Sequence, residues 1–274
     1  MRITTLIENQ AHPERLGLEA EHGLSFYIEV DGHVYLSDVG QSGKFADNAK
    51  KLGVDLAKVE ALVISHHHYD HGGGLDRFFQ DNGQARVFLR QAATEEYVVD
   101  SPPDPLRYIG LDKAVLQTQA DRVEKVAENQ EVAPGLHLLT TIPDQFPGPE
   151  GDLRLQVFSE DGLHPDGFAH EMATVVVGQE GLVVLTGCAH HGVLNMLVAA
   201  KRAFPGGEIR AVVGGFHLHH ENRKAVREIG EYLVGEDIPT IVTGHCTGKK
   251  AMLLLEEILG DRFQRLYTGM VMDF

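Results

Sequence analysis

The chain has 274 residues, enough for one large domain or two small ones, and its hydrophobic share of 43% supports a sizeable core. No apolar run approaches the roughly 20 residues that cross a bilayer, so no membrane-spanning protein is expected. The net charge of -16, from 24 basic and 40 acidic residues, argues against a nucleic-acid partner, because phosphate binding needs a clustered basic surface. A small anionic substrate is compatible with this charge where bound cations offset it.

The first residues, 1–8, predict an edge strand rather than a signal peptide, and hence a cytoplasmic protein. Apolar β-type runs and helical patterns then alternate along the chain. The β-type runs lie at 24–30, 34–38, 60–65, 136–141, 153–158, 173–177, 182–186, 210–214 and 240–243. The helical patterns lie near 44–52, 75–81, 191–203, 220–234 and 248–259. This order predicts an α/β fold in which helices cover mixed sheets.

We expect residues 1–274 to form a single domain. Within it, the stretch from about 91 to 135 differs from the rest in composition and periodicity. It carries Pro102, Pro103 and Pro105, many charges and weaker periodicity. Long insertions in compact domains are often functional, so we interpret this stretch as a lid over a site. A plain surface excursion is the alternative.

The run 65–74 carries the strongest chemical signal, because His66, His68, Asp70 and His71 are all metal-ligand types. An apolar run precedes it and three glycines follow it, which predicts a strand that ends in a loop. His66 and His68 point to the same side of an extended segment, whereas His67 points away. Asp70 and His71 follow in the turn, where the backbone can aim them at a second point. One short segment can therefore supply ligands to two neighbouring metals, and a solvated histidine-rich loop is the alternative.

Four further candidates stand at the ends of β-type runs. They are Asp38, His170, Cys188 and His245. The two cysteines, Cys188 and Cys246, are too few for a disulfide scaffold, and both lie close to histidines. Singly, each candidate could be an ordinary core or turn residue. Together with the histidine-rich run, they predict a metal centre where several strand ends meet.

These motifs resemble those of the metallo-β-lactamase superfamily, and the resemblance covers about residues 20–250. Asp38 corresponds to its first acidic motif, His170 to its third motif and His245 to its last, while Cys188 stands where an aspartate is usual. The resemblance implies a four-layer αβ/βα sandwich with two mixed β-sheets and a metal centre at its edge. Finer similarity to the subgroup named for 7,8-dihydropterin-6-methyl-4-(β-D-ribofuranosyl)aminobenzene 5'-phosphate synthase lies in the segments 21–25, 38–43, 186–190, 214–218 and 244–248.

The resemblance further implies a binuclear centre. Its first metal would be held by His66, His68 and His170, and its second by Asp70, His71 and His245. Cys188 would lie close to both, bind one of them, or bind neither, with His190 as its replacement or as a pocket residue. A thiolate favours zinc, and manganese and iron are the alternatives. Asp38 would orient a histidine ligand or the hydroxide, or cap a turn.

Several residues are candidates for contact with substrate. His217 stands in a glycine-flanked loop after an apolar strand, a position that suits a proton donor or a substrate ligand. Thr247 and the amides after His245 open a predicted helix, whose N-terminus could accept a phosphate. Glu21 and His22 are further pocket candidates.

The leading hypothesis is a metal-dependent hydrolase that directs hydroxide, available near pH 7 on a bound metal, at a small phosphorylated or ester-type metabolite. The first alternative is the pterin synthase reaction, a condensation that releases pyrophosphate. A diiron redox protein is disfavoured because His68 stands where such proteins carry a carboxylate. A metal-binding sensor without catalysis is the remaining alternative, and a homodimer is compatible with the frequency of two-fold oligomers.

Overall fold

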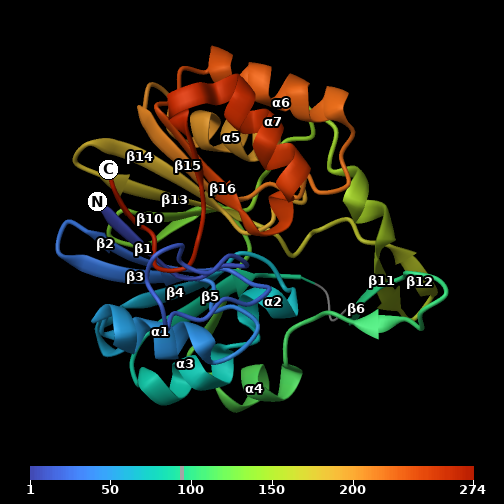
Figure 1. The fold of residues 1–274 in the computed structure, drawn as a ribbon. Coiled ribbons are helices and arrows are strands. Elements are labelled where there is room, and N and C mark those ends of the chain that lie inside the picture. Colours follow the sequence, from blue (N-terminus) through green and yellow to red (C-terminus); the bar gives the residue numbers. More distant parts are fainter. Residues whose placement is uncertain (93–95) are drawn as a thin grey trace.

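The computed structural model describes residues 1–92 and 96–274, and within them two large mixed β-sheets pack face to face between layers of helices (Figure 1). The first sheet, in spatial order, consists of β18 (Val271–Asp273), β1 (Arg2–Ile7), β2 (Ser25–Val30), β3 (His33–Ser37), β4 (Ala61–Ile64), β5 (Arg86–Arg90) and β8 (Val123–Val126). The second consists of β17 (Phe263–Arg265), β16 (Thr240–Gly244), β15 (Ile209–Gly215), β14 (Gly181–Thr186), β13 (Ala173–Gly178), β10 (Leu136–Leu139) and β9 (Gln130–Ala133). This arrangement confirms the expected four-layer αβ/βα sandwich.

The helices cover the two outer faces of the sandwich (Figure 1). On the first sheet lie α1 (Lys44–Leu52), α3 (Leu75–Asp81) and the short turn η1 (Leu56–Lys58). On the second lie α5 (Val193–Ala203), α6 (Arg223–Gly235), α7 (Lys249–Leu259) and the turn η4 (Gly260–Arg262). The shorter elements α2 (Tyr69–Gly72), α4 (Lys113–Thr118), η2 (Glu150–Arg154) and η3 (His245–Thr247) lie in the connections.

The continuous apolar runs are explained by burial on both faces of each sheet. In β14, Val183 and Leu185 point into the core between the sheets, while Leu182 and Val184 face α5–α7. All four are at most 4% exposed. Because successive side chains of a strand alternate in direction, such a strand cannot show the apolar–polar alternation of a half-exposed strand.

The N-terminal strand differs from its prediction. β1 lies between β2 and β18 and is not an edge strand, because the last residues of the chain return to pair with it. Arg2 pairs with Asp273 at 2.8 Å, and the Met1 amino group donates to the Phe274 carbonyl at 2.7 Å. Helices expected near 44–52, 75–81, 191–203, 220–234 and 248–259 are confirmed.

A third, smaller sheet projects from one end of the sandwich (Figure 1). Its strands in the described residues are β12 (Gly162–Pro165), β11 (Leu155–Ser159), β6 (Glu96–Val99) and β7 (Arg107–Tyr108). The predicted insertion at 91–135 therefore has different limits, since β8 and β9 belong to the two large sheets. Conversely, residues 155–158 of the run expected at 153–158 form part of β11 in the third sheet, and residues 153 and 154 belong to η2. Residues 93–95 of the predicted insertion lie outside the described part of the chain.

Candidate metal centre

The candidate ligands follow strands whose carboxyl ends point the same way. β3 is parallel to β4, and β14, β15 and β16 are mutually parallel. Asp38 follows β3, His66 follows β4, and Cys188, His217 and His245 follow the three strands of the second sheet. Parallel strands present their carboxyl ends at one edge, so the chain assembles these side chains at one rim of the sandwich.

The first group of donors consists of His66, His68 and His190. One ring nitrogen from each lies within 4.8 Å of the others. All three side chains are buried, and each Nε2 atom has no hydrogen-bond partner among the described residues. A buried polar atom without a partner is costly, so three such nitrogens on neighbouring rings fit a bound cation.

The second group consists of Asp70, His71, Cys188 and His245, whose donor atoms also lie within 4.8 Å of one another. Cys188 Sγ is 3.3 Å from His71 Nε2, and His245 Nε2 is 3.2 Å from both His71 Nε2 and Asp70 Oδ2. Asp38 adjoins this group because it contacts the other ring nitrogen of His71. One carboxylate, one thiol and two imidazoles match the ligand types that zinc uses.

The Nδ1 atoms of His71, His190 and His245 contact oxygen atoms that fix the orientation of each ring. His71 Nδ1 is 2.7 Å from Asp38 Oδ2, and His190 Nδ1 is 2.7 Å from Asp152 Oδ1. His245 Nδ1 is 2.9 Å from the side-chain oxygen of Asn9. Such contacts set the ring tautomer and leave Nε2 free for a metal.

Burial sets the protonation states that ligation requires. Burial, with neighbouring imidazoles, holds the pKa values of His66, His68 and His190 well below 6.5, which keeps these rings neutral. Burial alone would raise the pKa of Asp70, but His71, His22 and His245 hold it well below its usual value. Burial and the adjacent Cys246 raise the pKa of the Cys188 thiol, so ligation by Cys188 requires a cation to displace its proton.

His170 lies beside the first group but is oriented differently from the sequence prediction. Its Nδ1 accepts the His67 backbone N–H at 3.0 Å, and its Nε2 lies 3.0 Å from Asp166 Oδ2. His170 can still ligate with other partners, because donor atoms of His68, Asp166 and His170 lie within 4.8 Å of one another. The structure places His190, predicted as a pocket residue or a replacement for Cys188, where the third imidazole of the first group is needed.

The remaining predicted residues divide into two sets. His22 and His217 line the cavity, and His22 Nε2 is 3.2 Å from Asp70 Oδ2. Glu21 and Thr247 do not line it. Glu21 accepts the N–H and hydroxyl of Ser42, and Thr247 Oγ1 accepts the Phe216 N–H at 3.0 Å, so both support loops beneath the site. Asp38 is buried and also accepts the N–H and hydroxyl of Ser65, which makes it a positioning residue.

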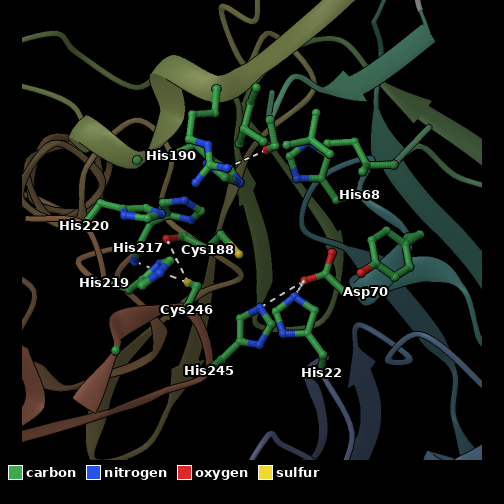
Figure 2. A pocket seen from close by; sticks show the side chains of 18 of the residues that line it. His22, His68, Asp70, Cys188, His190, His217, His219, His220, His245 and Cys246 are labelled. Carbon is green, nitrogen blue, oxygen red and sulfur yellow. Dashed lines mark hydrogen bonds and ion pairs between the residues drawn. The ribbon is translucent and has the colours of Figure 1, made fainter. Parts of the chain in front are cut away.

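The donor groups open onto a cavity of about 440 Å³. Figure 2 shows His22, Asp70 and His245 on one side of it and His68 and His190 on the opposite side. Backbone strain is concentrated at its rim, because Asp38, Ala189, His217 and His245 all have φ between 49° and 59°. Non-glycine residues with positive φ are uncommon and persist where the surrounding structure holds them, often at functional sites.

Several site residues were missed by the sequence analysis. Asp152 carries no motif and reaches the site from η2, where it contacts His190 and lies 3.4 Å from His217 Nε2. Glu171 is buried beneath the ligand loop, where its carboxylate accepts the backbone N–H groups of His190 and His191 at 2.8 Å each. Glu171 directly follows the predicted ligand His170, and this position is the one sequence feature that could have indicated a role at the site.

An αβ/βα sandwich that gathers these donors at its rim has the fold of a class of metal-dependent hydrolases. Residues 18–245 match the metallo-beta-lactamase superfamily, and the chain belongs to it. A curated relative from Methanocaldococcus jannaschii, named 7,8-dihydropterin-6-methyl-4-(beta-D-ribofuranosyl)-aminobenzene-5'-phosphate synthase, is 25% identical over 93% of this chain and 90% of its own. Among solved structures, Tm1679, described as a metal-dependent hydrolase of the beta-lactamase superfamily, is 32% identical with a TM-score of 0.86, covering 100% of this chain and 99% of its own. A diphosphatase from the PhnP family shares the fold at 15% identity, with a TM-score of 0.54 and coverage of 100% and 97%.

Proposed function

We propose that this protein is a binuclear metal-dependent hydrolase of a small phosphorylated or ester-type metabolite. The observation that carries the proposal is the pair of adjacent donor groups that opens onto one cavity, the first of them with three unpartnered nitrogens among the described residues. A non-catalytic metal sensor has no need of a cavity beside the ions.

In this proposal one divalent ion is held by His66, His68 and His190, and the other by Asp70, His71, Cys188 and His245. When bound, such ions supply an acidified water and an electrophile for the substrate oxygen. The donor set of imidazoles, one thiolate and one carboxylate favours zinc over magnesium or calcium, which prefer oxygen ligands.

The protein groups around the ions hold protons at defined atoms. With Nε2 committed to ligation, Nδ1–H of His71 donates to Asp38 and Nδ1–H of His190 donates to Asp152. The His66 Nδ1 atom lies 3.0 Å from Ser65 Oγ, which itself donates to Asp38. Asp38 therefore fixes ligands of both groups.

His217 is the candidate proton donor for the leaving group. Burial would lower its pKa, but Cys246 and Asp152 raise it above 6.5. It lines the cavity, and its buried Nδ1 has no partner among the described residues. A general acid needs a pKa near the working pH and access to the leaving atom, and His217 combines both features.

The test combines metal analysis with a substrate panel. Protein purified with zinc is assayed on a phosphodiester, a phosphomonoester, a lactone and a thioester, beside His68→Ala and the control His164→Ala, whose exposed imidazole lies on β12. The proposal expects turnover of a panel member that His68→Ala abolishes together with metal and that His164→Ala retains. A fully metal-loaded protein that hydrolyses none of them contradicts the proposal.

The second candidate is the condensation that the curated relative is named for, and similarity over 93% of this chain favours it. The same donor groups would stabilise a leaving diphosphate. Product formed from a pterin pyrophosphate and an arylamine ribose phosphate, without hydrolysis of the panel, would establish this alternative.

A further inference from the structure

The wall of the cavity opposite the sandwich is formed by the small third sheet. Tyr69 N–H, within the histidine-rich segment, donates to the Ile109 carbonyl at 2.8 Å, and His68 forms a β-bridge with Gly110. The end of β7 is thus tied by its backbone to the segment that carries the ligands. The third sheet is therefore anchored beside the candidate ligands of this segment.

Two rows of side chains cross the inner face of this sheet. The first row, Ile109, Tyr97 and Val157, is buried and packs against Tyr69. In the next row the register pairs Arg107 with Val99 and Val99 with Leu155. Residues directly opposite one another on adjacent strands share a face, and all three of these line the cavity.

Two arginines stand at the ends of the second row. The Arg107 guanidinium lies over the Tyr69 ring, 5.4 Å from its centre, which holds the charge at the cavity. Arg154 precedes Leu155, lines the same cavity and donates to Ser101 Oγ at 2.6 Å. Neither arginine forms an ion pair with a carboxylate within residues 1–92 and 96–274.

The charge of this wall is opposite to that of the whole chain. The protein carries -16, yet the arginine, lysine, aspartate and glutamate side chains among the described residues that line the cavity are Arg107, Arg154 and Asp70. A cavity lined by one sign of charge raises the local concentration of the opposite ion. Asp70 itself belongs to the second donor group and is not available to neutralise the arginines.

We infer that the third sheet is the specificity surface of this site, and that Arg107 and Arg154 bind a phosphate at the end of the substrate remote from the reacting bond. Val99 and Leu155 contact the apolar part between the two ends. Guanidinium groups bind phosphate through paired N–H donors, and both arginines line the cavity. This inference rests on the proposed function in one respect, namely which end of the substrate reacts at the metal centre.

The experiment uses two ligands that differ by one remote phosphate. Isothermal titration calorimetry on the zinc-loaded protein compares thymidine 5'-phosphate with thymidine 3',5'-bisphosphate. We expect the bisphosphate to bind about tenfold more tightly, the contribution of a charge-assisted hydrogen bond. The double variant Arg107→Gln/Arg154→Gln should reduce this preference below about twofold.

The control is Arg202→Gln, which removes an exposed arginine at the end of α5. Equal affinities for the two nucleotides in the unmodified protein overturn the inference, as does a preference that survives in the double variant. Because the readout is binding, a protein that hydrolyses nothing but keeps the arginine-dependent preference disproves the proposed hydrolysis alone. A protein that hydrolyses the panel without the preference disproves this inference alone.

Discussion

Asp152 tests how the metal site is organised. Its carboxylate contacts the proposed ligand His190 but belongs to neither donor group. Its Oδ1 lies 2.7 Å from His190 Nδ1, and the side chain is 11% exposed. Burial raises the pKa of Asp152 to about 8, and the neighbouring His217 opposes that rise. Substitution Asp152→Asn keeps the size of the side chain and removes the ability to carry the negative charge that a cation bound to His190 would favour.

The expected loss follows from the single contact. A hydrogen bond to a charged group contributes about 1.5–3 kcal/mol, which corresponds to a factor of roughly 10–150 in an equilibrium constant. Loss of a partner behind a ligating histidine typically lowers metal affinity by about 10–100-fold. We therefore expect Asp152→Asn to weaken binding of the ion in the first group by about 10–100-fold.

The assay is competition for zinc against a chromogenic chelator, with far-UV circular dichroism as a check of folding. Asp161→Asn, in the exposed turn between β11 and β12, is the matched control and should bind zinc as the unmodified protein does. Unchanged affinity for both ions in folded Asp152→Asn would refute the role assigned to this carboxylate.

Three further predictions concern individual residues. His190→Ala should lose about one zinc per chain, whereas His170→Ala, whose ring nitrogens both have partners within the protein, should retain both; the reverse pattern in metal analysis would restore the sequence-based assignment. Cys188→Asp should keep the fold and the metal content, since carboxylate is also a zinc ligand, and loss of cooperative melting would show instead that Cys188 acts only in the core. Burial lowers the pKa of His67 from 6.5 to about 3, so the folded protein loses stability as the pH drops below 6.5 and the unfolded chain takes up this proton. The melting temperature of metal-free His67→Gln should therefore fall less between pH 7 and 4 than that of the unmodified metal-free protein. Equal falls in melting temperature would contradict this.

The fold and much of the donor set could be predicted because their signals are local. The ligands in 66–71 lie on one short segment, and their spacing alone fixes which of them share a side. The β-type runs that end at Asp38, Cys188 and His245 were also readable, since strands buried on both faces are continuously apolar.

What sequence reasoning missed depends on contacts between distant segments. β6 and β11 pair across more than 50 residues, with Leu155 opposite Val99, and neither strand reveals its partner. The orientation of His170 depends on Asp166 and the His67 N–H, which contact its two ring nitrogens and lie outside its own β-type run. Asp152 reaches the site through the packing of η2, for which its own sequence carries no motif.

The central claim is tested most directly by anomalous diffraction at the zinc edge from crystals grown with zinc. We predict two peaks about 3.5–4 Å apart, one among His66, His68 and His190 and the other among Asp70, His71, Cys188 and His245. Donor groups without a peak, or zinc bound only elsewhere on the chain, would contradict the account.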